Sequence, residues 1–359
     1  MDIHYRQRNI ENGLSRLKRR TDVTEKNKET IKRFTDYNFA RGLSPARVDK
    51  YLTALPVLAT QIGKDFELAG KDDIQRVVGQ IERTQLSPWT KRDYRSALKY
   101  FYRWLRDTEE FPPEVRWLKT TAKATAKKLP SDLLTPDEVI KLINTADSPR
   151  DRAFIATLYE SGCRVGELGG LRVKDIQFDK YGAILTVDGK TGMRRVRVVA
   201  AAPFLASWLS FHPQRQDREA FVWITVDKRE LMGYRGITNL MRRVTERTGI
   251  KKKTNCHSFR HSRASYLANF LSSAQMNEHF GWTQGSKMAA VYIHLSGRAV
   301  DSALLNTYGI KMDEDNQTET LQPKVCGQCS AWNPFTSEFC ERCHQLLATD
   351  EIRTEEKPA

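Results

Sequence analysis

The residues of this chain best suited to chemistry are His257 and Arg260, in His257-Ser-Phe-Arg260, and Tyr292, which follows 32 residues after Arg260. A tyrosine hydroxyl has a pKa near 10, so as a nucleophile it needs a proton acceptor and cationic surroundings. A histidine supplies the first and an arginine the second. His257 and Arg260 are three residues apart at a predicted helix start, so they share one face. This pattern favours a covalent attack of tyrosine on a phosphate.

Further cations supply the rest of such a site. Arg164 lies in Ser161-Gly-Cys-Arg-Val-Gly-Glu167-Leu, at a predicted helix start whose backbone N–H groups favour anions. Two arginines suit the two non-bridging oxygens of a phosphodiester, because guanidinium groups stay charged and bind such oxygens in pairs. Lys190 lies at the tip of a predicted hairpin, from which its amine could protonate the departing alkoxide.

Each of these residues also has an ordinary structural explanation. A tyrosine is far more often a core or surface residue than a nucleophile. Arg164 and Arg260 can be surface cations, and His257 a helix cap. Lys190 can be a solvated turn residue, and Trp282 a core anchor. Only the combination favours a reactive site.

The elements that must position these residues fall into two groups. Up to about residue 107 the pattern is helical, with helices expected near 25–41, from 45, near 71–82 and from 88. Ser44-Pro45 and Ser87-Pro88 each place a capping serine before a proline at the first helical position. This predicts a four-helix bundle of about 85 residues, a common size for a small domain.

A second domain is expected to begin at Thr135-Pro-Asp-Glu138, which has the spacing of a capping box. Helices are expected near 136–146, 150–161, from 166, and near 203–211, 236–248, 258–270, 273–280 and 285–294. Between them, 183–187 and 194–199 alternate with period two around Asp188-Gly-Lys-Thr-Gly192, which predicts a β-hairpin. The expected fold is mainly α with a small β-hairpin or sheet (α+β).

Charge and composition limit the kinds of partner that this chain is expected to bind. Lys and Arg number 59 against 44 Asp and Glu, a net charge of +15. Residues 311–359 carry five basic and ten acidic side chains, so residues 1–310 hold about +20. A body this basic favours a polyanion such as nucleic acid. The N-terminus lacks the apolar segment of a signal peptide, and the longest apolar stretch, 198–209, is too short to span a membrane. We expect no membrane association and a cytoplasmic, nucleoid-associated protein.

Four of the six cysteines gather near the C-terminus as Cys326-Gly-Gln-Cys329 and Cys340-Glu-Arg-Cys343, with ten residues between the pairs. Four thiolates at this spacing form a tetrahedral structural site for Zn²⁺. A redox dithiol is the alternative, but it would not need two pairs. Because its surroundings are acidic, we expect this zinc ribbon to contact protein rather than DNA phosphates.

The order Gly-Cys-Arg-Val-Gly-Glu-Leu, Gly-Lys on a hairpin, His-x-x-Arg, Gly-Trp and Tyr-Ile-His resembles the signature of the tyrosine recombinase (phage integrase) family. The resemblance covers about residues 135–310, and the bundle before it resembles that family's core-binding domain. The stretch from Gly281 to Gly297 looks most like archaeal integrase-type members.

The resemblance implies a site-specific recombinase that cleaves and religates DNA through a 3′-phosphotyrosyl link to Tyr292. Arg164 and Arg260 would stabilise the transition state, Lys190 would protonate the 5′-hydroxyl, His257 would assist proton transfer and Glu167 would support the site. The family often has histidine where this chain has Trp282, whose indole donates a hydrogen bond but cannot carry a proton. Trp282 is therefore expected to position groups or bind phosphate. Neither ATP nor a catalytic metal is expected, since religation conserves the phosphoester bond and the chain has no P-loop motif.

The resemblance also implies specific double-stranded DNA sites as partners, with a homotetramer assembled on two sites. Two alternatives stay open: a type IB topoisomerase-like enzyme that only relaxes DNA, and a catalytically silent DNA-binding regulator. The expected segments are a basic N-terminal helix or arm (1–22), a core-binding domain (23–108), a basic linker (109–134), a catalytic domain (135–311), an acidic linker (312–322), a zinc ribbon (323–347) and a polar tail (348–359).

Overall fold

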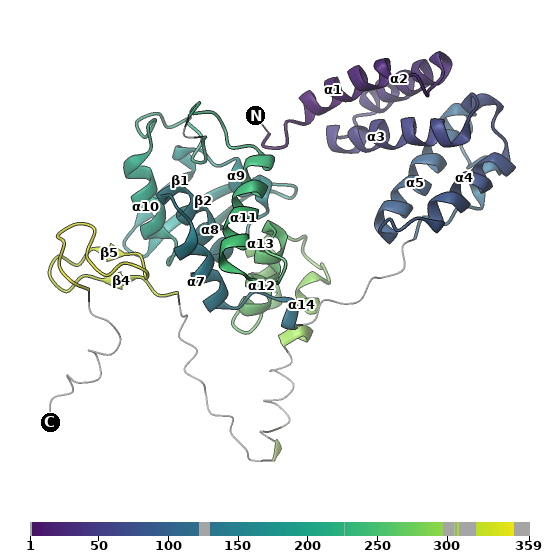
Figure 1. The fold of residues 1–359 in the computed structure, drawn as a ribbon. Coiled ribbons are helices and arrows are strands. Elements are labelled where there is room, and N and C mark those ends of the chain that lie inside the picture. Colours follow the sequence, from purple (N-terminus) through teal and green to yellow (C-terminus); the bar gives the residue numbers. More distant parts are fainter. Residues whose placement is uncertain are drawn as a thin grey trace. The chain divides into compact units, whose positions relative to one another are not determined.

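The computed structural model describes residues 2–121, 130–225, 227–296, 305, 307–308 and 321–347. The lysines of the expected basic linker at 123, 127 and 128, the acidic linker from 312 to 320 and the polar tail lie outside these residues. The chain divides into two compact units (Figure 1). The helical unit is Tyr5–Lys127, and the mixed unit joins Met1–His4 to Lys128–Ala359.

The helical unit contains the expected helices with nearly the expected bounds. They are α1 (Arg6–Arg19), α2 (Glu25–Ala40), α3 (Pro45–Ile62), α4 (Lys71–Arg83) and α5 (Pro88–Leu105). A short helix that the sequence did not predict, α6 (Pro113–Arg116), lies within the expected linker. Both Ser-Pro starts are confirmed in position, because α3 and α5 begin at those prolines, but the Ser44 side chain makes no capping hydrogen bond. The Ser87 hydroxyl accepts a hydrogen bond from the backbone N–H of Thr90, which satisfies one of the unpaired groups of the first turn.

The core of the helical unit extends beyond the four expected helices. Ile10 and Leu17 of α1 are buried in the same cluster as the residues of α2 to α5. The N-terminal basic segment is therefore part of the bundle, since its apolar stripe packs on α3 while its arginines stay outside. Val115 and Leu118, within the expected linker, are buried in this cluster too.

The mixed unit carries the remaining elements. They are α7 (Pro136–Thr145), α8 (Pro149–Ser161), α9 (Val165–Gly169), β1 (Ile176–Asp179), β2 (Gly182–Gly189), β3 (Gly192–Val198), α10 (Ala202–Phe211), α11 (Tyr234–Thr248), α12 (Cys256–Leu267), α13 (Ser273–Phe280), α14 (Met288–Ser296), β4 (Lys324–Val325) and β5 (Trp332–Asn333). The predicted capping box starts α7: the Thr135 N–H donates to the Glu138 carboxylate at 2.8 Å, and the Glu138 N–H donates to the Thr135 hydroxyl at 3.3 Å.

The predicted hairpin is confirmed as β2 and β3, whose register pairs Ala183 with Val198 and Gly189 with Gly192. This leaves Lys190 and Thr191 as its two-residue tip. A third strand that the sequence did not predict, β1, pairs antiparallel with β2. It is four residues long and largely exposed, so its alternation of Ile176 and Phe178 with polar residues is too short to identify a strand. Helices α8 and α10 cover this sheet (Figure 1).

The first residues of the chain pack on the mixed unit. The Ile3 side chain is 1% exposed and belongs to the main apolar cluster of that unit. Its carbonyl accepts a hydrogen bond from the backbone N–H of Tyr234 at 2.8 Å, and the ring of His4 lies 4.8 Å from the Tyr234 ring. A Cβ on Gly169 of α9 would lie 3.0 Å from Ile3, so Ile3 supports the helix that follows Arg164.

The C-terminal segment 321–347 forms a two-stranded module in which β4 pairs antiparallel with β5. Its Phe335 ring lies 5.2 Å from the Phe204 ring of α10. The fold is mainly helical with small antiparallel sheets, as expected. Across the described ranges, no helix is long and apolar enough to cross a membrane.

Candidate active site and metal centre

Arg164 is placed by the turn between α8 and α9. Gly162 ends α8 with a φ of 56°, a conformation that favours glycine, and Arg164 then caps α9. The Arg164 N–H donates to the Glu167 carboxylate at 2.8 Å. The backbone N–H groups at this helix start are therefore less able to bind an anion than expected, because α9 is only five residues long and the Arg164 N–H is already bonded to Glu167. The guanidinium remains the group that can bind an anion.

Glu167 holds two arginines at once. Its carboxylate accepts hydrogen bonds from Arg164 and from Arg194 of β3, each at 2.7 Å. Burial acts to raise the pKa of Glu167, but hydrogen bonds and charge from these arginines outweigh it and hold the pKa below its ordinary value. Glu167 stays ionised and fixes the Arg164 side chain, which agrees with a supporting role.

Arg194 is a site residue that sequence reasoning missed. Its side chain is 8% exposed and donates to the carbonyl oxygen of His279 at 3.0 Å, in addition to Glu167. The run Arg194-Arg-Val-Arg was interpreted only as strand alternation. The available signal was that alternation itself, since it places Arg194 and Val196 on the same, inward face of the hairpin.

Arg260 is buried, with only 3% of its surface exposed. It donates to the carbonyl oxygen of Gly162 at 2.8 Å and to that of Phe280 at 2.5 Å. Burial, and then the nearby charge of Arg164, lower the pKa of Arg260 to about 10. It therefore keeps its charge at neutral pH.

Three distant segments meet at the turn after α13. The Gly281 carbonyl accepts hydrogen bonds from Arg164 at 3.4 Å and from the Thr191 hydroxyl at 3.2 Å, next to the Phe280 carbonyl that binds Arg260. Gly281 has a φ of 59°, which turns these carbonyls toward the cations. The structure thus brings both predicted arginines and the hairpin tip together. Lys190, beside Thr191, is exposed.

Tyr292 lies on α14 and is 3% exposed. Its ring stacks on that of Trp282, with centroids 5.5 Å apart and planes 1° apart. Burial raises the pKa of Tyr292, while the charge of Arg260 acts in the opposite direction. Its hydroxyl forms a 2.5 Å hydrogen bond with Nδ1 of His261, a residue that the sequence motifs did not single out.

Trp282 joins the cationic part of the site to the tyrosine. Its ring stacks on Phe280 at 4.9 Å as well as on Tyr292, and the Arg260 guanidinium carbon lies 5.5 Å from its centroid. A stacked indole fixes the phenol ring by its face and attracts the guanidinium. These contacts fix the indole against the Phe280 and Tyr292 rings.

His257 lies in the first turn of α12 and is exposed. Its ring centroid is 4.3 Å from that of His261, one turn further along the helix. The histidine hydrogen-bonded to Tyr292 is thus His261. The signal was present, because His261 is four residues after His257 and so lies on the same helical face.

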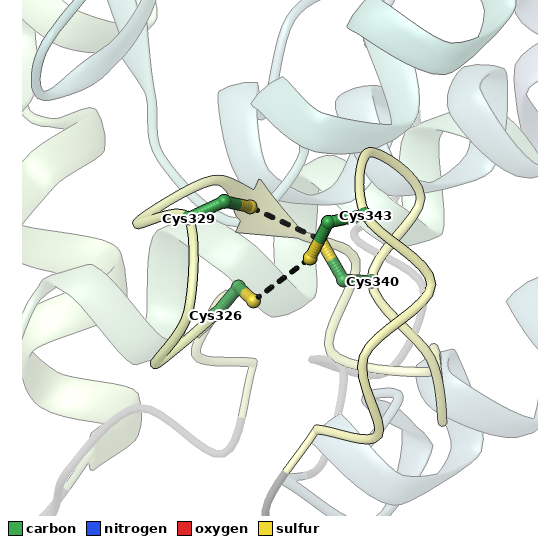
Figure 2. A group of neighbouring side chains, drawn as sticks. All are labelled: Cys326, Cys329, Cys340 and Cys343. Carbon is green, nitrogen blue, oxygen red and sulfur yellow. Dashed lines mark hydrogen bonds between the residues drawn. The ribbon is translucent and has the colours of Figure 1, made fainter.

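The four C-terminal cysteines converge in one group (Figure 2). Their sulfur atoms all lie within 4.8 Å of one another, with 3.5 Å between Cys326 and Cys343 and 3.6 Å between Cys329 and Cys340. Four thiolates at ~2.3 Å from a tetrahedral zinc ion would be separated by about 3.8 Å. The four sulfur atoms are therefore close enough to serve together as ligands of one metal ion.

Comparison with known proteins agrees with this geometry. Residues 132–298 match the phage integrase family, and residues 31–109 match the phage integrase N-terminal SAM-like domain. Over 246 residues the chain is 27% identical to tyrosine recombinase XerC of Shewanella amazonensis, covering 66% of this chain and 81% of that protein. Over 145 residues it is 30% identical to tyrosine recombinase XerA of Pyrococcus furiosus, covering 39% of this chain and 49% of that protein.

A solved structure shares the fold. A lambda integrase tetramer bound to a Holliday junction matches with a TM-score of 0.57 and 14% sequence identity, covering 72% of this chain and 78% of that chain. The matches span both units, and the integrase match contains the two arginines, the hairpin lysine and the tyrosine. The chain therefore belongs to the tyrosine recombinase, or phage integrase, family of site-specific recombinases.

Proposed function

We propose that this recombinase cleaves and rejoins double-stranded DNA at specific sites through a 3′-phosphotyrosyl intermediate on Tyr292. The observation that carries the proposal is the junction at Phe280 and Gly281. There, Arg164 and Arg260 bind adjacent carbonyls, and Trp282, the next residue, stacks on Tyr292. A phosphate bound by the two guanidinium groups would lie near the tyrosine hydroxyl.

In the proposed step, Oη of Tyr292 bonds to phosphorus as the bond from phosphorus to the 5′ oxygen breaks. Arg164 and Arg260 stabilise the negative charge that grows on the non-bridging oxygens. Lys190 gives a proton to the departing 5′ oxygen, which its exposed position on a two-residue tip favours. His257, exposed at the start of α12, assists at the phosphate. Glu167 and Trp282 position the arginine and the tyrosine.

Rejoining is the same step in reverse, so it needs no ATP. The 5′ hydroxyl of the same or another strand attacks the phosphotyrosine, and Tyr292 leaves. Exchange between strands requires two DNA sites in one complex, and the tetramer of lambda integrase on a Holliday junction is a structural neighbour of this chain. We propose a tetramer on two sites, held to DNA mainly through phosphates and therefore salt-sensitive.

Trapping the intermediate tests the mechanism. The DNA is a nicked duplex that carries the site recovered by binding selection from random-sequence DNA, and the products are resolved on a denaturing gel. Wild-type protein should form a covalent adduct, and Tyr292→Phe should form none. Tyr308→Phe is the matched control, because Tyr308 is 79% exposed and should react as the wild type does. An adduct that persists in Tyr292→Phe would contradict the assignment.

A two-site assay separates recombination from its enzymatic alternative. Strand exchange between two duplexes supports the recombinase, whereas relaxation of supercoiled DNA without exchange would support a topoisomerase-like activity. A protein that binds the selected site but forms no adduct under any condition would support the silent regulator.

We also propose that Cys326, Cys329, Cys340 and Cys343 hold a structural Zn²⁺ ion. The metal supplies folding energy to a module that has few other buried residues. Mass spectrometry of the native protein should find one zinc per chain. Cys343→Ser should lose it, whereas Cys256→Ser, at an isolated buried cysteine, should keep it. Zinc retained in Cys343→Ser would rule out the four-thiolate site.

The ribbon is proposed to contact protein, including neighbouring protomers. Three large apolar side chains, Trp332, Phe339 and Leu346, are 41–57% exposed on this small module. Deleting residues 320–359 should weaken assembly on paired sites while leaving binding to a single site intact. Unchanged assembly and recombination after the deletion would exclude this role.

A further inference from the structure

His261 is placed at the reacting atom of the proposed nucleophile. Its Nδ1 lies 2.5 Å from the Tyr292 hydroxyl oxygen, and its ring centroid lies 5.7 Å from that of Tyr292. The histidine extends from the middle of α12 and the tyrosine from α14, two helices that pack against each other. His261 is half-buried whereas Tyr292 is 3% exposed, so α14 must shift before a phosphate reaches the hydroxyl.

The proposed cleavage leaves one proton to be placed. When Oη bonds to phosphorus, the phenolic proton must leave, and a phenol near pKa 10 does not release it to water readily at neutral pH. Burial makes this harder, because it raises the pKa of Tyr292 further. Lys190 has the opposite task, since it gives a proton to the 5′ oxygen. A separate acceptor is therefore needed at the tyrosine.

Titratable and charged groups lie on the helix of His261 and on the two helices packed against it. The ring of His257 lies against that of His261 on α12, and Arg260 precedes His261 in the sequence. On α14, the Tyr292 hydroxyl is hydrogen-bonded to Nδ1 of His261. On α13, burial lowers the pKa of His279 to about 4, so that residue adds no charge at neutral pH. The Tyr292 hydroxyl can donate its proton to Nδ1 of His261 when that nitrogen carries none.

We propose that His261 is a catalytic residue that accepts the Tyr292 proton on Nδ1 during cleavage and returns it during rejoining, an assignment that rests on the proposed phosphotyrosyl mechanism. The Oη–phosphorus bond forms, the bond from phosphorus to the 5′ oxygen breaks, its electron pair stays on that oxygen, and Lys190 protonates it. In rejoining, the tyrosine leaves and His261 restores its proton. In this assignment His257 acts at the phosphate and not at the tyrosine.

His261→Asn separates basicity from position. An asparagine side chain places an amide group where Nδ1 lies, so it can keep the hydrogen bond to Tyr292 but cannot take its proton. We expect adduct formation on the nicked duplex to slow by about 100-fold in single turnover, within the range typical of a general base. The wild-type rate should fall as pH drops and His261 becomes protonated. The variant should lose this dependence and instead accelerate toward high pH, where the phenol ionises.

A substrate with sulfur in place of the 5′ bridging oxygen shows whether a variant impairs proton donation to the leaving group or proton removal from Tyr292. A thiolate leaves without an acid, so this substrate should restore Lys190→Ala but not His261→Asn. Melting temperature and affinity for the selected site are measured on every variant, which separates misfolding from loss of chemistry. His257→Asn, on the same helical face, should slow the reaction through the phosphate but keep the wild-type pH dependence at the tyrosine.

Several results would overturn the proposal. If His261→Asn reacted within about threefold of the wild-type rate with an unchanged pH profile, His261 would only position the tyrosine. Faster reaction would show that the hydrogen bond restrains it. Rescue of His261→Asn by the sulfur substrate would place His261 at the leaving group. If wild-type protein formed no adduct, the phosphotyrosyl mechanism itself would fail.

Discussion

Gly162 offers a test of how tightly the site is packed. This residue ends α8 with a φ of 56°, and its carbonyl accepts a hydrogen bond from Arg260. A Cβ at this position would overlap Cε1 of Phe280 and lie 3.3 Å from two further ring atoms. Gly162→Ala therefore pushes on the ring that also stacks with Trp282.

Gly249→Ala measures the loss of folding free energy that comes from the left-handed backbone conformation alone. Gly249 ends α11 with a φ of 69° in the same unit, but nothing lies within 4 Å of its added Cβ. Each substitution should cost about 1 kcal/mol for the left-handed backbone. Overpacking against Phe280 adds about 1–3 kcal/mol for Gly162 alone. We expect losses of about 1 kcal/mol for Gly249→Ala and about 2–4 kcal/mol for Gly162→Ala.

Differential scanning calorimetry of the full chain measures this difference. In a unit of more than 200 residues, the melting temperature should fall by roughly 2–4 °C for Gly249→Ala and by roughly 4–16 °C for Gly162→Ala. Because both residues lie in the mixed unit, the same transition reports both changes. Equal losses would show that Phe280 moves away freely, and the inference that it is rigidly held at the site would be wrong.

Three other changes have defined outcomes. Glu167→Gln should destabilise the mixed unit by about 3 kcal/mol in urea unfolding, because it leaves the buried Arg194 without its counter-charge. Since the pKa of Glu167 is lowered in the folded state, its contribution to stability is present above the unfolded pKa near 4 and is lost on acidification. The variant should not show this loss. His279 has a pKa of about 4 in the folded chain, so near pH 6.5 the unfolded chain binds a proton there that the folded chain does not bind. The free energy of unfolding should therefore fall from about pH 6.5 toward 4, and His279→Gln should flatten this slope. Ile3→Ala should lower the stability of the mixed unit by about 2–4 kcal/mol through a core cavity, measured by the same unfolding, whereas Leu68→Ala, at a side chain that is 70% exposed, should have little effect.

The sequence predicted the elements of this protein well because their signals are local. Serine caps, prolines at first helical positions and the capping box at Thr135 are contained within four residues, and the structure has helices where they occur. The hairpin alternation is equally local. The β1 strand was missed because its alternation covers only four largely exposed residues, and the packing of Ile3 because it depends on a partner far along the chain.

The site was predicted unevenly for the same reason. Arg164, Lys190, Arg260 and Tyr292 could be selected from short motifs, but which groups touch depends on the turn after α13, where segments more than 80 residues apart meet. In the sequence, Arg194 and His261 resemble ordinary strand and helix residues. Only the folded structure shows that Arg194 contacts Glu167 and that His261 contacts Tyr292. Spacing along the chain identifies candidate residues, whereas contacts assign their partners.

The two arginines of the site rest on different supports. Cys163 and Leu168, on either side of Arg164, belong to the main apolar cluster of the mixed unit, and the Glu167 carboxylate fixes the guanidinium. Tyr292 instead belongs to a separate small cluster formed by α12, α13 and α14, and Arg260 donates to the carbonyl oxygen of Phe280 in that same cluster. Segments with few buried contacts open at lower free energy than the core. Arg164 can therefore stay preorganised, as the proposed transition-state stabilisation requires, whereas a shift of α14 toward a phosphate would also be felt at Arg260.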